Sequence, residues 1–313
     1  MAAVAAPARS IVNAMSVDVE DYFQVSSFDA AVSRDSWDSR ESRVCANTDR
    51  MLELFAETDI LATFFVLGWV ADRFPDLVRR IADAGHEIAS HGYHHRLVYE
   101  LTPEQFREDI RRAKDVLETI SGTPVLGYRA PSFSVTARSL WALDVLIEEG
   151  HRYDASVFPV HHDRYGIPGS PRHAHRLERS AGSIVEAPAS TVRLAGVNLP
   201  IAGGGYFRLL PYMWTRWGIE RLNTVEQRPA IFYVHPWEID PDQPRIAAPA
   251  LSRLRHYRHL DKTEGRLRRL MRDFKFSTVC KLVQTSCAAD GAGLPTSVEP
   301  RAAGPVTRRV TWV

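Results

Sequence analysis

Two histidines and a run of acids are the residues of this chain whose types and spacing could build a metal site. His91 and His95 lie in Ala-Ser-His-Gly-Tyr-His-His, and the acids lie earlier, in Ser-Val-Asp-Val-Glu-Asp-Tyr-Phe, which begins at Ser16. Two imidazoles and one carboxylate can hold a catalytic divalent ion and leave coordination positions open for water and substrate. The combination makes an enzyme the leading hypothesis.

The histidine pair is weak evidence by itself, because His86 and His94 make this spacing common in a histidine-rich stretch. His91 and His95 can reach one ion if they occupy one helical turn or a tight loop that enters a helix. The signal therefore depends on the acids that accompany the pair.

The acidic run is the stronger half of the pattern. Asp18 lies inside an otherwise apolar run, where an unpaired carboxylate would be costly. Side chains two positions apart in a strand share a face, so Asp18 and Glu20 point the same way, and Asp21 points the opposite way unless the strand has already ended. A metal ligand and a base could thus lie side by side.

Short apolar runs alternate with helical patterns, which implies a parallel sheet, either doubly wound or closed as a barrel. In both arrangements the chemistry gathers at the carboxyl ends of the strands, where loops converge. The expected strands are 13–19, 62–67, 86–89, 125–128 and 230–235, and the expected helices are 48–58, 69–84, 102–120, 136–149, 209–226 and 263–275.

The composition indicates a globular chain without a strong charge preference. Its 313 residues are 45% hydrophobic and 25% charged, and 39 Lys+Arg against 38 Asp+Glu give a net charge of +1. That balance offers no case for binding nucleic acid or an anionic membrane surface. No apolar run is long enough for a membrane span.

Cysteine usage and the N-terminal sequence bear on the compartment. Three cysteines, Cys45, Cys280 and Cys287, form no zinc-type pair, and their odd number argues against a disulfide framework. No apolar stretch long enough for a signal sequence precedes Ser16. We therefore expect a cytoplasmic protein.

The chain divides into one large domain and two short ends. We expect residues 1–12 to be a flexible N-terminus, 13–284 to form the catalytic domain and 285–313 to be a flexible C-terminal tail. Residues 151–179 are rich in His, Pro, Arg and Gly without clear periodicity, which predicts a long surface loop beside a binding cleft.

Five ordered motifs resemble those of the NodB-homology polysaccharide deacetylases, also called carbohydrate esterase family 4. After the acidic run and the histidine pair come the Arg-x-Pro motif at Arg129, an aspartate motif at Asp154 and a hydrophobic residue before a histidine at Val234-His235. The resemblance implies an α/β fold, a distorted (β/α) barrel of the NodB-homology type.

Three segments resemble more narrowly the branch of this family associated with exosortase and exopolysaccharide gene clusters. They are Val-Asp-Val-Glu-Asp-Tyr-Phe at 17–23, Gly-Gly-Gly-Tyr-Phe-Arg at 203–208 and His-Tyr-Arg-His-Leu-Asp-Lys-Thr-Glu at 256–264. They extend the resemblance from about residue 13 to about residue 279.

The resemblance also implies a division of roles for a divalent metal ion, zinc first with cobalt as the alternative. The metal ligands would be Glu20, His91 and His95. One departure matters, because many members carry two adjacent aspartates in the first motif. An Asp-x-Asp register makes Asp18 the base and Glu20 the ligand, with Asp21 as the alternative ligand.

The remaining roles follow from the later motifs. Arg129 would hold Asp18 ionised and oriented, and His235 would protonate the leaving amine as general acid. Asp154 would tune the acid or fix a ring orientation. Tyr206, Arg208 and Trp237 are the expected substrate-binding residues, although Arg208 could instead bind a carboxylate of the protein.

The implied activity is metal-dependent hydrolysis of N-acetyl groups on an amino-sugar polysaccharide, or on its lipid-linked oligosaccharide precursor, in exopolysaccharide biosynthesis. The nearest alternative is an amide hydrolase acting on a small nitrogenous molecule. A carbohydrate-binding protein without catalysis is another, although binding alone needs neither Asp18 as base nor His235 as acid. An assembly role for the basic segment 253–272 is third, and a solvated helix face explains those charges more simply.

Overall fold

A nine-stranded sheet forms the centre of the protein, of which this computed structural model describes residues 11–289. Two further strands, β8 and β9, form a separate hairpin. The strands are β1 Val12–Val19, β2 Thr63–Val66, β3 Glu87–Ser90, β4 Gly127–Tyr128, β5 Tyr153–Asp154, β6 His175–Arg179, β7 Gly182–Glu186, β8 Thr191–Leu194, β9 Val197–Pro200, β10 Ile231–Val234 and β11 Lys275–Ser277.

The sheet confirms the predicted α/β class. Its order is β10-β1-β2-β3-β4-β5-β7-β6, with β11 pairing β1 beside this path. Every pair is parallel except the β6–β7 hairpin. Within residues 11–289 no ladder joins β6 to β10, so the strands follow the order of an incomplete barrel.

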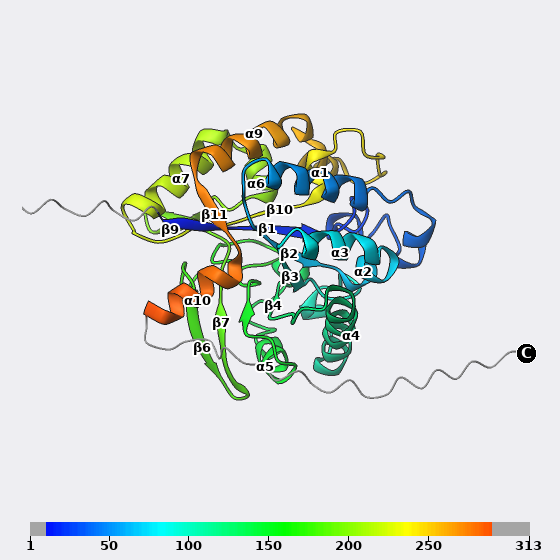
Figure 1. Ribbon diagram of the computed structural model, residues 1–313, viewed down its shortest axis with the longest axis horizontal. Coiled ribbons are helices and arrows are strands. Elements are labelled where there is room, and N and C mark those ends of the chain that lie inside the picture. Colours follow the sequence, from blue (N-terminus) through cyan, green and yellow to red (C-terminus); the bar gives the residue numbers. More distant parts are fainter. Residues whose placement is uncertain (1–10, 290–313) are drawn as a thin grey trace, which may run out of the picture.

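Helices cover the outside of this sheet (Figure 1). Helices α3 and α4 pack against β3, and α9 packs against β11. The helices are α1 Val44–Ala56, α2 Gly68–Arg73, α3 Pro75–Asp83, α4 Pro103–Ser121, α5 Trp141–Glu148, α6 Gly204–Leu209, α7 Tyr212–Thr224, α8 Ala250–Tyr257, α9 Leu260–Asp273 and α10 Val279–Ala289, with short 3-10 turns η1 Ser26–Phe28, η2 Arg34–Ser39, η3 Val98–Glu100, η4 Pro131–Phe133 and η5 Pro236–Ile239.

The structure corrects three predicted boundaries. The helix expected over 69–84 is two helices, α2 and α3, because Pro75 lacks an amide proton and begins a new helix. The loop expected over 151–179 contains β5 at its start and β6 at its end. Residues 285–289, expected to belong to the C-terminal tail, are part of α10, and residue 12, expected to belong to the flexible N-terminus, is the first residue of β1. Residues 1–10 and 290–313 of the two predicted ends lie outside the described range.

Successive side chains of β1 lie on opposite faces of the sheet and pack in two different hydrophobic clusters. Met15, Val17 and Val19 pack in the large cluster beneath the helices, whereas Ala14 packs on the opposite face with residues of β2 and α10. Ser16 and Asp18 share the face of Ala14 because the strand period is two. Helix α10 contacts β1 near its amino end, which leaves the carboxyl end for the site.

No helix within residues 11–289 is both long enough and apolar enough to cross a membrane.

His151 makes stability sensitive to acid. The side chain is 1% exposed, and burial lowers its pKa from 6.5 to about 3. Below pH 6.5 the unfolded chain binds a proton at this position that the folded chain rejects, so stability falls as pH drops from 6.5 toward 3. At pH 5 this group should cost about 2 kcal/mol relative to pH 7.

The test is denaturant unfolding at pH 7 and pH 5. His151→Gln should reduce the loss of unfolding free energy between these pH values by about that amount. The matched control is His161→Gln, which changes an exposed histidine and should leave the loss unchanged. An equal pH dependence in wild type and His151→Gln would contradict the assignment.

Candidate active site and metal centre

A cavity of about 200 Å³ lies where the carboxyl ends of β1, β3 and β10 converge. A larger hollow of about 510 Å³ runs along charged side chains of α4 and contains none of the predicted site residues. The site cavity is lined by Asp18, Glu20, Val25, Ser26, Ser27, His91, His95, Ser132, Phe133, Tyr165, Gly205, Arg208, Tyr233, His235, Trp237, Glu238, Arg255 and His256.

Glu20, His91 and His95 form a buried group whose ligand atoms all lie within 4.8 Å of one another. The Oε2 atom of Glu20 lies 2.6 Å from Nε2 of His95 and 3.9 Å from Nε2 of His91. Nδ1 of His91 lies 2.8 Å from the carbonyl oxygen of Arg129, which leaves Nε2 directed at the carboxylate. Burial lowers the pKa of His91 to about 4, so its ring is neutral and can offer a lone pair.

The two histidines lie in a loop after β3 rather than on a helix. His95 has a φ of 51°, a left-handed conformation that is uncommon without glycine. Its carbonyl accepts a hydrogen bond from Nη2 of Arg34, and the carboxylate of Asp109 on α4 accepts the amides of Tyr93 and His94. Contacts from η2 and α4 therefore hold the strained loop.

Asp21 lies outside this group, so the structure places Glu20 rather than Asp21 beside the histidines. Its Oδ2 atom accepts hydrogen bonds from Ser42 Oγ and from the amides of Arg43 and Val44. These contacts satisfy donors at the start of α1. Asp21 thus fixes the entry of α1, while burial raises its pKa to about 6.

Arg129 is fully buried and holds Asp18. Its Nη1 atom donates to Asp18 Oδ1 at 2.6 Å and to Ser16 Oγ at 2.8 Å, and Nε donates to the carbonyl of Ala155. The guanidinium carbon lies 4.2 Å from the ring centre of Phe65. Oδ2 of Asp18 remains on the cavity side, 3.9 Å from Nε2 of His235.

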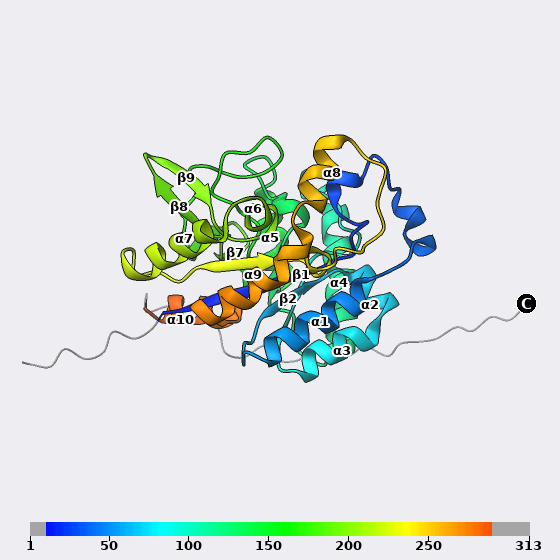
Figure 2. The ribbon, with the colours of Figure 1, turned by 90° about the horizontal axis from the view of Figure 1, so that it is seen from above.

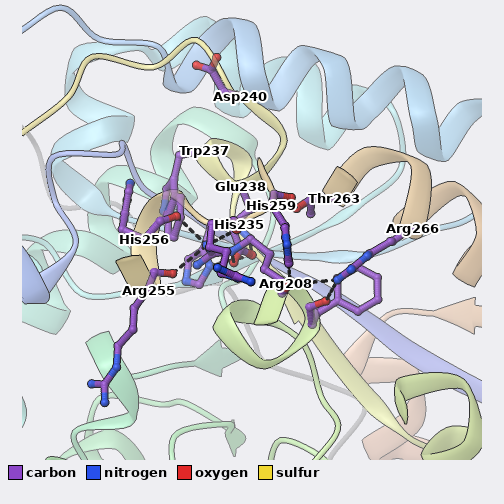
Figure 3. Close-up of polar contacts among 12 residues, drawn as sticks. Arg208, His235, Trp237, Glu238, Asp240, Arg255, His256, His259, Thr263 and Arg266 are labelled. Atoms are coloured by element: carbon purple, nitrogen blue, oxygen red, sulfur yellow. Dashed lines mark hydrogen bonds and ion pairs between the residues drawn. The ribbon is translucent and has the colours of Figure 1, made fainter. Parts of the chain in front are cut away.

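His235 is oriented by a carboxylate that sequence reasoning missed (Figure 3). Oε2 of Glu238 lies 3.2 Å from Nδ1 of His235 and also accepts the His235 amide. Burial alone would lower the pKa of His235, but Glu238, with Glu20 and Asp18 nearby, raises it to about 9. A glutamate three positions after a turn-starting residue is a capping pattern, and that signal could have identified Glu238.

Arg208 lines the cavity but binds acceptors of the protein. Its Nε donates to Glu238 Oε1 at 2.7 Å, and Nη1 donates to the carbonyls of Arg255 and His256 at 2.9 and 2.6 Å. The ion pair is buried on both sides. Of the two predicted partners for Arg208, substrate or a carboxylate of the protein, the structure shows the second.

Trp237 is a wall residue rather than an open platform for a sugar ring. Its indole is 4% exposed and stacks with His235 and with His256. Its Nε1 donates to Glu20 Oε1 at 3.1 Å, which leaves Oε2 for the histidines. Trp237 therefore contacts the buried group of Glu20, His91 and His95 through Glu20.

Asp154 does not line the cavity, so the structure gives no support for its predicted catalytic role. It pairs in register with Glu186 on β7, and Ser156 donates to its Oδ1 atom. Burial and the neighbouring Asp154 raise the pKa of Glu186 well above its usual value. Ser156 in turn accepts the amide of Ala130, which anchors the turn after Arg129.

Tyr206 lies at the edge of the cavity, where its hydroxyl is 3.1 Å from that of Tyr165, a lining residue.

The glycines that precede Tyr206 allow this segment to pack closely against β10. Gly203 has a φ of 125°, and a Cβ there would lie 1.8 Å from the carbonyl oxygen of Tyr233. Gly203 therefore allows this segment to bridge to β10, and among the three glycines only Gly205 lines the cavity.

Helix α8 forms one wall of the cavity and lies beside the segment that follows β1 (Figure 2). Phe28 of η1 contacts His256 and Tyr257, with ring centres 4.7 and 6.1 Å apart. Nε2 of His256 lies 2.7 Å from Gln243 Oε1. His256 and Tyr257 begin the segment at 256–264, but no role in the site was predicted for them, because the sequence does not show that α8 packs against η1.

Two family models match consecutive parts of the chain. Residues 27–146 match the model described as "Polysaccharide deacetylase", and residues 155–284 match "Domain of unknown function (DUF3473)". The first match contains the two histidines and Arg129, and the second contains His235, Glu238 and Arg208.

Named relatives match about a third of the chain. A peptidoglycan-N-acetylglucosamine deacetylase of Bacillus cereus is 31% identical over 98 residues, which are 31% of this chain and 36% of the relative. A peptidoglycan deacetylase of Helicobacter pylori is 31% identical over 116 residues, 36% of this chain and 37% of the relative. A chitooligosaccharide deacetylase of Rhizobium leguminosarum bv. trifolii is 31% identical over 114 residues, 36% of this chain and 49% of the relative. The matched part is thus at most about half of each relative.

Two solved structures share the fold over most of the chain. A crystal structure described as a candidate polysaccharide deacetylase from Mycobacterium smegmatis has a TM-score of 0.59 and 20% identity, covering 95% of this chain and 97% of that one. PuuE allantoinase has a TM-score of 0.58 and 15% identity, covering 88% of this chain and 89% of that one. The family match and the named relatives together support the predicted relationship of this chain to the polysaccharide deacetylases.

Proposed function

We propose that this protein is a metal-dependent deacetylase that hydrolyses N-acetyl groups on an amino-sugar polymer. The proposal rests mainly on one observation: Glu20, His91 and His95 form one buried group, and Asp18 and His235 lie beside it. The relatives named as deacetylases of peptidoglycan and of chitooligosaccharide support the substrate class.

The residues of the buried group fit a divalent ion. Two imidazoles and a carboxylate suit zinc or cobalt and leave room for further ligands. The outer atoms of two ligands are already engaged, Nδ1 of His91 by the Arg129 carbonyl and Oε1 of Glu20 by Trp237. Such outer contacts commonly fix the orientation of metal ligands.

We infer that Asp18 and His235, whose side chains lie 3.9 Å apart at the cavity, would carry the two proton transfers of the reaction. A bound ion would supply polarisation of the acetamide and a more acidic water. Asp18, with Oδ1 held by Arg129, would take the proton of the attacking water at Oδ2. His235, with Nδ1 facing Glu238, would give a proton from Nε2 to the departing nitrogen.

The proposal also includes a biological role and a cellular location for this activity. The motif segments at 17–23, 203–208 and 256–264 support a role in exopolysaccharide biosynthesis. We propose a cytoplasmic protein that acts on an N-acetylated polysaccharide or its lipid-linked precursor. Detection of the protein outside the cell membrane would overturn this setting without affecting the chemistry.

Metal binding can be measured by titration against a fluorescent zinc chelator, without any assay of activity. Glu20→Gln should abolish tight binding because it removes the anionic ligand. Trp237→Phe should weaken binding about 10- to 100-fold, because Glu20 loses the contact that orients it.

The control is Trp217→Phe, which changes a partly exposed tryptophan of α7 and should leave the affinity unchanged. Wild-type affinity in Glu20→Gln would show that the ion, if any, binds elsewhere.

Turnover is tested by acetate release from N-acetylglucosamine oligomers, with chelator and with zinc or cobalt restored. Wild type should release acetate only when metal is present. Asp18→Asn should lower kcat about 10²- to 10⁴-fold, since the base is lost while the contact with Arg129 is kept. Asp163→Asn changes an exposed carboxylate and should have no effect.

Absence of acetate release from protein that holds the ion would overturn the deacetylase assignment. It would favour hydrolysis of a small amide, or carbohydrate binding without catalysis.

A further inference from the structure

We propose that the cavity accommodates a glycan that carries an acidic group, a carboxylate or a phosphate, beside the N-acetylated sugar, and that Arg255 binds this group. The inference rests on the proposed deacetylase function and specifies its substrate class. It follows from the charges that line the cavity and from the partners those charges already have.

Three carboxylates line the cavity, and each is already engaged. Asp18 is paired with Arg129, Glu238 is paired with Arg208, and Glu20 faces the two histidines. Arg255 is the additional charged side chain of the lining, and within residues 11–289 no carboxylate lies within ion-pair distance of it. Of the two arginines that line the cavity, Arg208 is thus paired with Glu238, and Arg255 has no carboxylate partner among residues 11–289.

The position of Arg255 is fixed by the network that orients His235. Its carbonyl accepts a hydrogen bond from Nη1 of Arg208, the same guanidinium that pairs with Glu238. In Figure 3 the Arg255 side chain extends away from this network while its carbonyl oxygen faces Arg208. The guanidinium is exposed and is therefore available to a ligand.

Other hydrogen-bonding groups lie at the cavity in the segment that follows β1. Arg164 reaches the carbonyl of Ser26, and the hydroxyls of Ser26 and Ser27 belong to lining residues.

These donors suit an anion better than a neutral sugar. A neutral N-acetylated sugar needs no guanidinium, whereas a carboxylate or a phosphate forms charge-assisted, often bidentate, hydrogen bonds with one.

The test compares kcat/KM for three substrates: a neutral N-acetylglucosamine tetramer, a hyaluronan tetrasaccharide that alternates N-acetylglucosamine with glucuronic acid, and an N-acetylglucosamine oligomer with a phosphate monoester at its reducing end. Wild type should prefer at least one acidic substrate. Arg255→Gln should lower the acidic-to-neutral ratio about fivefold to tenfold, because only the charge is lost and the backbone carbonyl remains. The acidic substrate that is affected identifies the group as carboxylate or phosphate.

The matched control is Arg253→Gln, which removes the same charge from an exposed residue of α8 outside the cavity lining. The proposal is wrong if wild type does not discriminate, if the ratio persists in Arg255→Gln, or if Arg253→Gln reduces it equally. Turnover of the neutral tetramer with any of these results would leave the deacetylase function standing. If no substrate is hydrolysed, the proposed function fails. The affinities of wild type and Arg255→Gln for the acidic oligosaccharides, measured by calorimetry, then show whether Arg255 binds the acidic group. Equal affinities would overturn that part of the proposal.

Discussion

A buried guanidinium, that of Arg129, is the interaction on which the site depends. A fully buried charge is tolerated only when it is paired and hydrogen-bonded, and here Asp18, Ser16 and the Ala155 carbonyl supply the partners. The carbonyl of the same residue orients His91. Arg129 therefore joins the proposed base to the proposed metal group, and brings together the ends of β1, β3, β4 and β5.

The site extends across both matched segments, so the segment of unknown function is part of the same structure and not an appendage. It supplies β10, which pairs with β1, and it supplies His235 with its partner Glu238. It also supplies Arg208, which fixes α8 at the cavity wall. The histidine ligands come from the first segment, and Glu20 precedes both.

Much of this arrangement could be predicted because local periodicity decides it. The period of two along β1 placed Asp18 with Glu20, and alternating strands and helices predicted the parallel sheet. The partners of Trp237 and Arg208 could not be predicted, because Glu20 and Glu238 are distant in sequence and a polar side chain does not reveal whether substrate or protein satisfies it. The surroundings of Asp154 could not be predicted for the same reason, since its register partner Glu186 lies on β7, far along the chain.

The pairing of β1 with β10 also constrains biosynthesis. Ser16 pairs in register with Thr63 on one side and with Tyr233 on the other, so the strand that carries the proposed base has neighbours made early and late in translation. A nascent chain can emerge with its histidine loop and Asp18 long before His235 leaves the ribosome. The proposed hydrolytic machinery can therefore assemble only after His235 has been made, and the edge of β1 that pairs with β10 stays unpaired until β10 emerges.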